Sequence, residues 1–278
     1  MTRQHVDVLV PTCDRPAALA VTLTALLAQA DAALLRVVVG DQGVAPAAGD
    51  PVVAGVLRVL RHHAIPVDVL HRPERRGVAE NRQALLEAAT AELLLVLDDD
   101  VLLGPGALAR LLRAEAELGP AMVGAASTGL SYLDDERPHE WVTFERVTGP
   151  VVPERVRKQA PGWERWRLHN AANPTHLAAH HPPEPGAGYT AYRIAWSAGC
   201  FLARRQAVLA AGGWAFWTEL PAGHAGEDVV LQLRLQERGG AVGVLPTGAY
   251  HLELPTTVTD RRADAYAIVL EAGSAGAD

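Results

Sequence analysis

Short apolar runs alternate with segments whose apolar residues recur at helical spacing, and this alternation continues from His5 to Ala126. The runs predict β-strands and the periodic segments predict helices. The predicted strands are His5–Val10, Leu34–Val39, Val67–Leu70, Leu93–Leu97 and Met122–Ala126. The predicted helices are Pro16–Ala30, Val52–His62, Gly77–Thr90 and Gly106–Leu118. Apolar strands that alternate with helices are typical of a parallel sheet covered on both faces, so we predict an α/β fold.

The pattern becomes irregular between Ser131 and Ala195, where Pro, His, Trp and Arg are frequent. We expect long loops there, with short helices or hairpins. Regular patterning then returns. It predicts strands at Ile194–Ala203, Ala241–Leu245 and Gly248–Leu252, and helices at Arg205–Ala211 and Glu227–Arg238. Residues 273–278 have the composition of a disordered tail.

Composition narrows the possible functions. The chain has 278 residues, 49% of them apolar, and a formal net charge of −7, which disfavours general binding to nucleic acid or to anionic membranes. Lys158 is the sole lysine, which excludes most lysine chemistry. We find neither a signal segment nor an apolar stretch long enough to span a bilayer, so we expect a cytoplasmic protein. Cys13 and Cys200 are expected to be reduced, buried thiols.

Three adjacent carboxylates, Asp98, Asp99 and Asp100, directly follow the apolar strand Leu93–Leu97. They repel one another, so solvent, arginine or a divalent cation must offset the repulsion. Oxygen ligands favour Mg²⁺ or Mn²⁺ over Zn²⁺. The triplet is therefore either a solvated loop or one part of a metal site.

A second acidic pair, Glu227 and Asp228, opens a predicted helix. The helix N-terminus stabilises ionised carboxylates, so the pair either serves that dipole or supplies Asp228 as a general base. His251 comes after this helix in the chain. A lone histidine is more often structural than a ligand, but its position makes His251 a candidate third metal-binding group.

Polar turns follow the first three predicted strands. The turn from Pro11 to Pro16 could hold a nucleotide through backbone N–H groups, Asp14 and Arg15, or it is an ordinary loop in which Asp14 caps the next helix. Asp41 lies at the same sheet edge with the same two alternatives. Arg75 and Arg76 precede a helix, which suits a diphosphate or a solvated charged turn.

Taken together, seven segments resemble the metal-dependent nucleotide-sugar glycosyltransferases of the GT-A fold, in particular glycosyltransferase family 2. In chain order they are V-L-V-P-T-C-D-R-P, V-V-V-G-D-Q-G, R-R-G-V-A-E-N, L-L-L-V-L-D-D-D-V, W-S-A-G-C-F-L-A-R-R, A-G-E-D-V-V-L and A-Y-H-L-E. The resemblance implies a Rossmann-like, mostly parallel central sheet flanked by helices, with a smaller mixed half. Residues 1–130 would bind the nucleotide sugar and 131–255 the acceptor, and 256–278 would form a C-terminal helix and the tail.

The resemblance also implies a role for each matching residue. Nucleotide binding would fall to Pro11, Thr12, Asp14, Arg15, Asp41, Arg76, Asp98 and Asp99. Asp100 and His251 would bind Mn²⁺ or Mg²⁺, while Gly199, Cys200 and Trp196 would line the sugar and acceptor site. Asp228 would be the catalytic base with Glu227 beside it. Asp41 would contact uracil, although Gly40 and Gln42 beside it depart from the family pattern.

The expected activity is inverting transfer of a sugar from a UDP donor to a small-molecule, glycan or peptide acceptor. One alternative, a sugar-nucleotide pyrophosphorylase, needs a glycine-rich first loop with basic residues, and Pro11–Pro16 has no glycine or lysine. A second alternative is a non-catalytic sugar-binding relative, because the tryptophan-rich middle of the chain could stack against sugars in an enzyme or in a binding module. No Q-x-x-R-W motif follows the acidic helix, which argues against a processive synthase. Abundant arginine and alanine with one lysine indicate a GC-rich bacterial genome.

Overall fold

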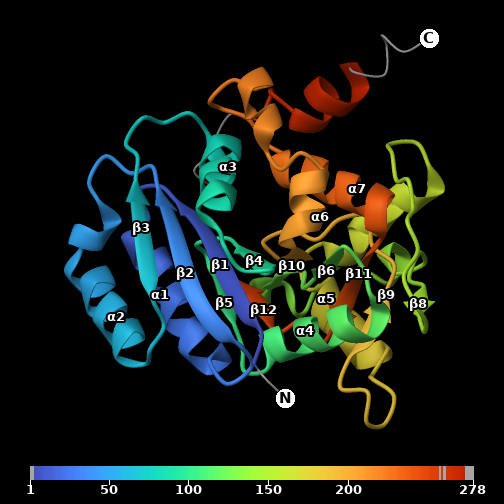
Figure 1. The fold of residues 1–278 in the computed structure, drawn as a ribbon. Helices are drawn as coiled ribbons and strands as arrows, with labels where there is room; N and C mark the ends of the chain where they lie inside the picture. Colours follow the sequence, from blue (N-terminus) through green and yellow to red (C-terminus); the bar gives the residue numbers. More distant parts are fainter. Residues whose placement is uncertain (1–2, 257, 259–260, 273–278) are drawn as a thin grey trace.

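The computed structural model describes residues 3–256, 258 and 261–272. A large sheet forms its centre (Figure 1), and it contains nine strands. The strand order is β3-β2-β1-β4-β10-β6-β11-β9-β8. The strands are β1 His5–Thr12, β2 Leu34–Asp41, β3 Val67–His71, β4 Leu93–Leu97, β6 Met122–Gly124, β8 Arg146–Val147, β9 Thr190–Tyr192, β10 Cys200–Arg204 and β11 Ala241–Leu245. Strands β3, β2, β1 and β4 are parallel, and β10 runs antiparallel between β4 and β6. The predicted α/β class with a mainly parallel sheet is confirmed.

A second, three-stranded sheet lies beside the end of β4. It contains β5 Val101–Leu103, β12 Ala249–His251 and β7 Thr128–Gly129, in the order β5-β12-β7. Strands β12 and β5 pair antiparallel with His251 opposite Val101. This register brings His251 next to the acidic triplet, from which it is separated by about 150 residues of chain.

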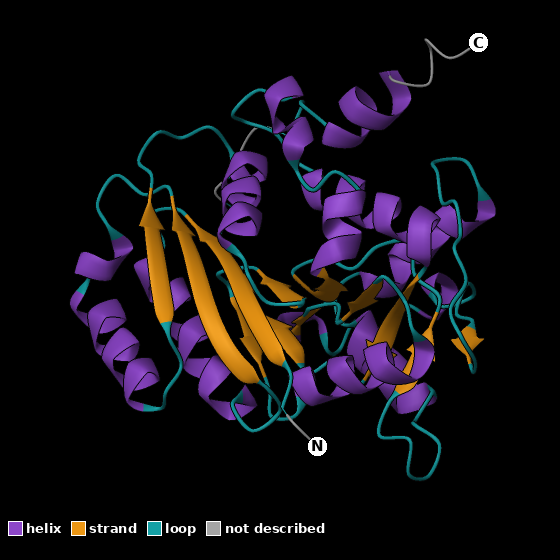
Figure 2. Cartoon of the chain, viewed as in Figure 1, coloured by secondary structure: helices purple, strands orange, loops and turns teal. Residues whose placement is uncertain are grey.

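Helices cover both faces of the large sheet (Figure 2). Helices α1 Pro16–Ala25, α2 Pro51–His62 and α4 Ala107–Leu118 pack on one face. Helices α3 Val78–Ala88, α5 Asn173–His180, α6 Arg205–Ala210 and α7 Glu227–Gly239 pack on the other. Short helical turns complete the structure at Leu26–Gln29, Ala47–Gly49, Leu130–Tyr132, Pro138–Glu140, Pro161–His169, Ala215–Glu219 and Ala267–Glu271.

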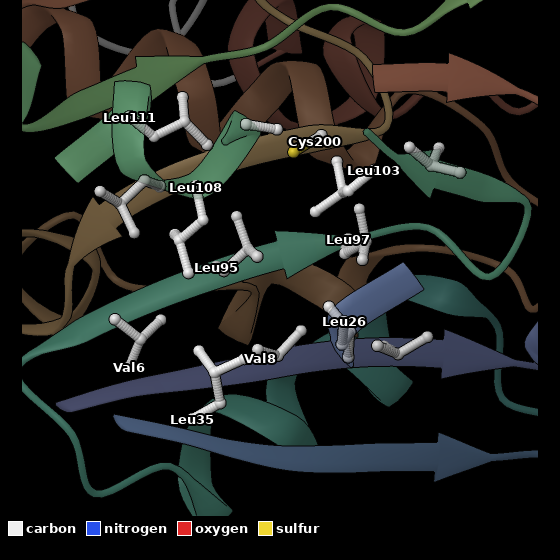
Figure 3. Packing of buried hydrophobic residues seen from close by; sticks show 14 of the residues in the cluster. Val6, Val8, Leu26, Leu35, Leu95, Leu97, Leu103, Leu108, Leu111 and Cys200 are labelled. Atoms are coloured by element: carbon white, nitrogen blue, oxygen red, sulfur yellow. The ribbon is translucent and has the colours of Figure 1, made fainter. Parts of the chain in front are cut away.

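The two faces carry separate apolar cores because side chains alternate along each strand. In β4, Leu93, Leu95 and Leu97 join the core under α1, α2 and α4, whereas Leu94 and Val96 join the opposite core. Figure 3 shows the first core, with β4 at its centre. A strand buried on both faces is fixed in position, so the turn that follows β4 has a rigid base.

One predicted strand is shorter than expected. Residues 194–199 form a loop, and the strand begins only at Cys200. The loop satisfies its backbone with side chains from α7: Gln236 Nε2 donates to the carbonyl of Ile194 at 2.9 Å, and Gln232 exchanges two hydrogen bonds with the backbone of Ser197. Apolar composition predicted a strand here, because a buried loop held by amide side chains has the same pattern.

Two other features bear on the sequence-based expectations. Among the described residues, no helix is long and apolar enough to cross a membrane. The tail predicted at 273–278 lies outside the described residues.

Candidate active site

The acidic triplet forms the turn between β4 and β5, and its middle member points into the protein. Thr12 Oγ1 donates to Asp99 Oδ2 at 2.6 Å, and Arg15 Nη1 donates to Asp99 Oδ1 at 3.0 Å. Thr22 Oγ1 donates to the backbone carbonyl of Asp99 at 2.8 Å. Burial raises the pKa of Asp99 to about 7, although Thr12 and Arg15 both act to lower it. Arginine and hydroxyl groups thus offset part of the predicted repulsion.

Asp100 faces His251 across the join between the two sheets. The distance from Asp100 Oδ2 to His251 Nε2 is 3.4 Å, and Arg15 Nη2 donates to the same oxygen at 2.6 Å. A carboxylate and an imidazole this close can share one cation, so these two residues fit a divalent ion. His251 Nδ1 accepts a hydrogen bond from the amide of Glu253 at 2.8 Å. A neutral imidazole that accepts at Nδ1 carries its proton on Nε2, so this hydrogen bond must open and the proton must move to Nδ1 before Nε2 can bind a metal.

This pair is small for a metal centre. Within the part of the chain that the structure describes, no three His, Cys, Asp or Glu side chains gather closely enough to hold an ion. Mg²⁺ and Mn²⁺ sites in nucleotide-dependent enzymes commonly combine one or two protein ligands with substrate phosphates. Any ion here would therefore depend on a phosphate-bearing ligand to complete its coordination.

Arg82 links the acidic triplet to the second acidic pair. Its side chain is buried on α3, where Nη2 donates to Asp98 Oδ1 at 2.6 Å and Nε donates to Glu227 Oε1 at 3.1 Å. Its guanidinium carbon lies 5.9 Å from the centre of the Trp214 ring. Gly226, with φ of 81°, is the N-cap of α7, and Glu227 follows it as the first residue of the helix. Arg82 therefore joins the end of β4 to the start of α7.

Asp228 is the half-buried second member of this pair. Burial and the neighbouring charge of Glu227 raise its pKa to about 7, while Arg82 acts in the opposite direction. A carboxylate with a pKa near 7 accepts protons more readily than an ordinary aspartate. The position and chemistry of Asp228 therefore suit a general base.

The loop before α7 packs against the start of α3. His224 is buried: its Nε2 accepts from the amide of Ala79 at 3.2 Å, and its Nδ1 donates to the carbonyl of Pro221 at 2.7 Å. Gly77 lies below this loop with φ of 96°, and a Cβ there would be 2.5 Å from His224 Cε1 and 2.6 Å from the carbonyl oxygen of Ala222. Only glycine allows the two segments to approach this closely.

The turn after β1 is held by Asp14 in a different way from the one expected. Asp14 does not cap α1, whose N-cap has no side-chain hydrogen bond. Its Oδ1 accepts from the amide of Val44 at 2.8 Å, and its Oδ2 pairs with Arg75. Of the two alternatives for this turn, the one in which Asp14 caps the helix is wrong, because its left-handed backbone (φ 54°) turns the side chain toward the loop after β2.

Asp41 shapes the loop after β2. Its Oδ1 accepts from the amide of Gly43 at 2.8 Å and its Oδ2 from the amide of Ala47 at 2.6 Å. Both oxygens of this buried side chain already have backbone partners. A direct contact between Asp41 and a nucleotide base therefore requires this loop to open.

Arg76 and Pro11 lie at the same edge of the sheet. Arg76 is exposed on the loop between β3 and α3, whereas Pro11 is buried near the end of β1. Beside them, Gln42 Nε2 donates to Glu80 Oε2 at 2.8 Å and Arg72 pairs with the other oxygen of Glu80. The carboxyl edge of β1, β2 and β3 is thus lined with arginine and carboxylate side chains.

Of the residues predicted to line the sugar and acceptor site, Gly199 and Cys200 lie beside the acidic triplet and Trp196 lies in an aromatic cluster. The carbonyl of Gly199 accepts from the amide of Asp98 at 2.9 Å, so this turn lies against the triplet. The Cys200 side chain packs in the core beside Leu97, and burial raises the pKa of its thiol (Figure 3). The buried thiol of Cys200 therefore does not line the site with an exposed surface, although the charge of Asp98 also acts to raise its pKa. Trp196 belongs to an aromatic cluster, with its ring 4.6 Å from that of Trp163.

Comparison with known sequences identifies the family. The sequence model described as "Glycosyl transferase family 2" matches residues 7–181, which is more than half of the chain. The chain belongs to glycosyl transferase family 2. None of the curated proteins compared with this family member is significantly similar to it in sequence.

Solved structures resemble this family 2 chain in fold. The mannosyltransferase PcManGT from Pyrobaculum calidifontis, in complex with GDP-Man and Mn²⁺, is 16% identical with a TM-score of 0.56, over 93% of this chain and 59% of that one. S. aureus TarS 1-349 in complex with UDP-GlcNAc is 14% identical with a TM-score of 0.59, over 93% of this chain and 60% of that one. The fold is GT-A, and the chain spans about three fifths of the length of these structures.

Sequence reasoning missed Arg82 and His224. Arg82 lies among the buried α3 residues Ala79, Leu85 and Leu86, where an unpaired charge would be very unfavourable. An arginine on an otherwise apolar helix face is the signal that could have predicted a buried ion pair. No comparable signal marks His224, because its partners are backbone groups of residues distant in sequence or in a turn.

Proposed function

We propose that this family 2 protein is a metal-dependent, inverting glycosyltransferase that moves a sugar from a nucleoside diphosphate, most simply UDP, to an acceptor nucleophile. One observation carries the proposal: the fold brings Asp228, a carboxylate with a raised pKa, to the acidic turn after β4, because Arg82 binds both Asp98 of that turn and Glu227, the residue before Asp228. Single displacement requires a base that is separate from the groups that bind the donor, because the acceptor is activated on the side opposite the leaving group.

The donor's nucleotide would bind at the carboxyl edge of β1, β2 and β3. Pro11, Thr12 and Arg15 would support the nucleotide, with Asp98 and Asp99 at its sugar side. Arg76 is exposed at this edge, so its charge is available to a diphosphate. Asp41 would act by holding the loop after β2, and a uracil contact would form only if that loop opens.

Asp100 and His251 would hold a divalent cation together with the donor's phosphates, and the cation would stabilise the negative charge that develops on the leaving diphosphate. The exposed Arg76 and the N–H groups of the nearby helix termini add positive potential at the same edge. Complexes of similar folds contain GDP-Man with Mn²⁺, UDP and UDP-GlcNAc, which supports a nucleotide-sugar donor.

Asp228 would take the proton from the acceptor's hydroxyl group or other nucleophile. The nucleophile then forms a bond to the anomeric carbon as the bond between that carbon and the diphosphate oxygen breaks. The electron pair leaves with the nucleoside diphosphate, and the proton stays on Asp228. Because the nucleophile attacks from the face opposite the leaving group, the configuration of the anomeric carbon inverts.

The acceptor would bind on the side of α7 that faces Trp196 and Gly199. Trp196 lies in the loop that Gln232 fixes to α7, and its ring packs with those of Trp163 and Trp166. Aromatic faces of this kind suit a sugar ring or an apolar scaffold. This favours a glycan or small-molecule acceptor over a peptide. The cytoplasmic location and the bacterial source stay predictions from the sequence.

A panel of nucleotide sugars tests the proposal. Thermal shift with UDP-GlcNAc and GDP-mannose, each with and without Mn²⁺, should show stabilisation by the UDP donor that requires the metal. Product analysis should then detect free UDP. Pyrophosphate release would instead indicate a pyrophosphorylase, and binding without any product would indicate a sugar-binding relative.

A further inference from the structure

Arg82 occupies an unusual position for an arginine, since both its charge and its planar group are enclosed. Its side chain is 6% exposed, yet it contacts carboxylates from two separate elements, Asp98 after β4 and Glu227 at the start of α7. Burying a guanidinium is unfavourable unless its donors are matched by acceptors of opposite charge. These two carboxylates provide that match, and neither lies on the helix that carries Arg82.

We propose that Arg82 is the positioning residue of the active site: by bridging Asp98 and Glu227 it fixes the start of α7, engages Glu227, and leaves Asp228 as the free carboxylate. The inference rests on the proposed role of Asp228 as the base. Arg82 touches neither donor nor acceptor in this account, and it acts through the two acids that it holds.

The charges around Asp228 support this division of roles. Glu227 of α7 and Asp98, which directly follows β4, both raise its pKa, in addition to its burial, whereas Arg82 of α3 and the backbone amide of Val229 lower it. Beyond the loop that precedes α7, Lys158 Nζ pairs with Asp264 Oδ2 at 3.0 Å. Arg82 therefore balances part of the charge of these three carboxylates, and its removal would increase their mutual repulsion.

The guanidinium shape matters as well as the charge. Nε and Nη2 lie on the same edge of the fork and reach two different acids, at 3.1 Å and 2.6 Å. A lysine has a single charged nitrogen, so it can keep the charge but cannot hold both acids in this geometry. Arg82→Lys therefore keeps the positive charge and removes the two-acid geometry, whereas Arg82→Met removes both.

The direct test measures the protonation of Asp228 without any need for turnover. Aspartate labelled with ¹³C at its side-chain carboxyl gives one NMR signal that disappears in Asp228→Asn, and this signal is titrated in each variant. In the wild type we expect a midpoint near pH 7. Arg82→Met should raise the midpoint by about 1 to 3 pH units, the usual effect of removing a nearby opposite charge, because Arg82 acts to lower the pKa of Asp228.

Two further variants keep the test decisive if Arg82→Met does not fold. Arg82→Lys should keep the midpoint close to that of the wild type, because the charge remains. Glu227→Gln should lower the midpoint, because the neighbouring like charge is removed.

Arg36→Met is the matched control: Arg36 also bridges two acids, Asp7 and Asp68, but at the opposite edge of the sheet. Its midpoint should equal that of the wild type.

The pH dependence of UDP release from UDP-GlcNAc with Mn²⁺ gives a second readout. The rising limb should move to higher pH in Arg82→Met, so that activity lost at pH 6 is largely recovered at pH 9. A uniform loss with an unmoved limb and an unmoved NMR midpoint would overturn the inference and leave Arg82 with a structural role alone. If no nucleotide sugar is turned over, the proposed function fails, while the NMR midpoints still decide whether Arg82 controls Asp228.

Discussion

Thr12 Oγ1 donates a 2.6 Å hydrogen bond to Asp99 Oδ2, and this bond joins the end of β1 to the acidic turn after β4. Both side chains are buried. A buried carboxylate is stable only when its oxygens have partners, so Thr12 and Arg15 together keep Asp99 inside the protein.

Substitution of Thr12 tests this link. Thr12→Val preserves shape but removes the donor, so we expect the free energy of unfolding to fall by about 1–3 kcal/mol. Thr24→Val is the control, because the Thr24 hydroxyl bonds only to the Ala20 carbonyl of its own helix. Urea unfolding measures both. Equal losses in the two variants would show that the contact with Asp99 has no special weight.

The metal proposal makes a prediction about Asp100. Asp100→Ala should abolish the Mn²⁺-dependent part of UDP binding, measured by calorimetry with and without the metal, and His251→Ala should weaken it. The matched control is Glu115→Ala, since Glu115 is also a buried acid paired with an arginine at 2.6 Å, but far from the acidic turn. Metal-dependent binding that survives in Asp100→Ala would contradict the assignment of Asp100.

Gly77 tests the contact between α3 and the loop before α7. With φ of 96° and a carbonyl oxygen 2.6 Å from the position of its missing Cβ, Gly77→Ala should destabilise the protein by about 1–3 kcal/mol and displace His224. Sugar transfer should fall with it, because α7 begins at this loop. Gly49→Ala is the control, since nothing lies within 4 Å of its Cβ position. Thermal unfolding compares the two, and similar melting temperatures would refute the packing argument.

Much of the fold could be predicted from sequence because it depends on local periodicity. β4 was predicted at the residues that form it, Leu93–Leu97, since a strand buried on both faces is apolar throughout. The loop at 194–199 was mistaken for a strand, because its stabilising partners, Gln232 and Gln236, lie on a helix more than thirty residues away. Periodicity carries no information about such contacts.

The candidate site shows the same limit. Asp98 and Asp228 could be chosen as candidates because acids after a buried strand and at a helix start are visible in the sequence. Arg82 was missed, since its role depends on the distance between two elements that only the folded chain brings together. Asp41 was recognised as a polar residue at the strand end, but its two backbone partners follow from the loop's three-dimensional path.

The raised pKa of Asp228 also predicts a stability effect. An acid whose pKa rises from 3.8 when unfolded to about 7 when folded destabilises the protein as pH increases through that interval. Asp228→Asn should therefore melt higher than the wild type at pH 8, by roughly 10 °C, since a shift of this size corresponds to about 4 kcal/mol, and the difference should vanish near pH 4. Asp31→Asn, at an exposed acid, is the control and should show no such trend. A lower melting temperature for Asp228→Asn at pH 8 would be inconsistent with the pKa.

The most direct test of the central claim compares UDP release by the wild type and by Asp228→Asn, with UDP-GlcNAc and Mn²⁺ at pH 8. The account predicts that Asp228→Asn binds UDP as tightly as the wild type but releases it from the sugar about 10²–10⁴-fold more slowly, because the base has been removed. Release at the wild-type rate would contradict the claim that Asp228 is the base of a glycosyl transfer site.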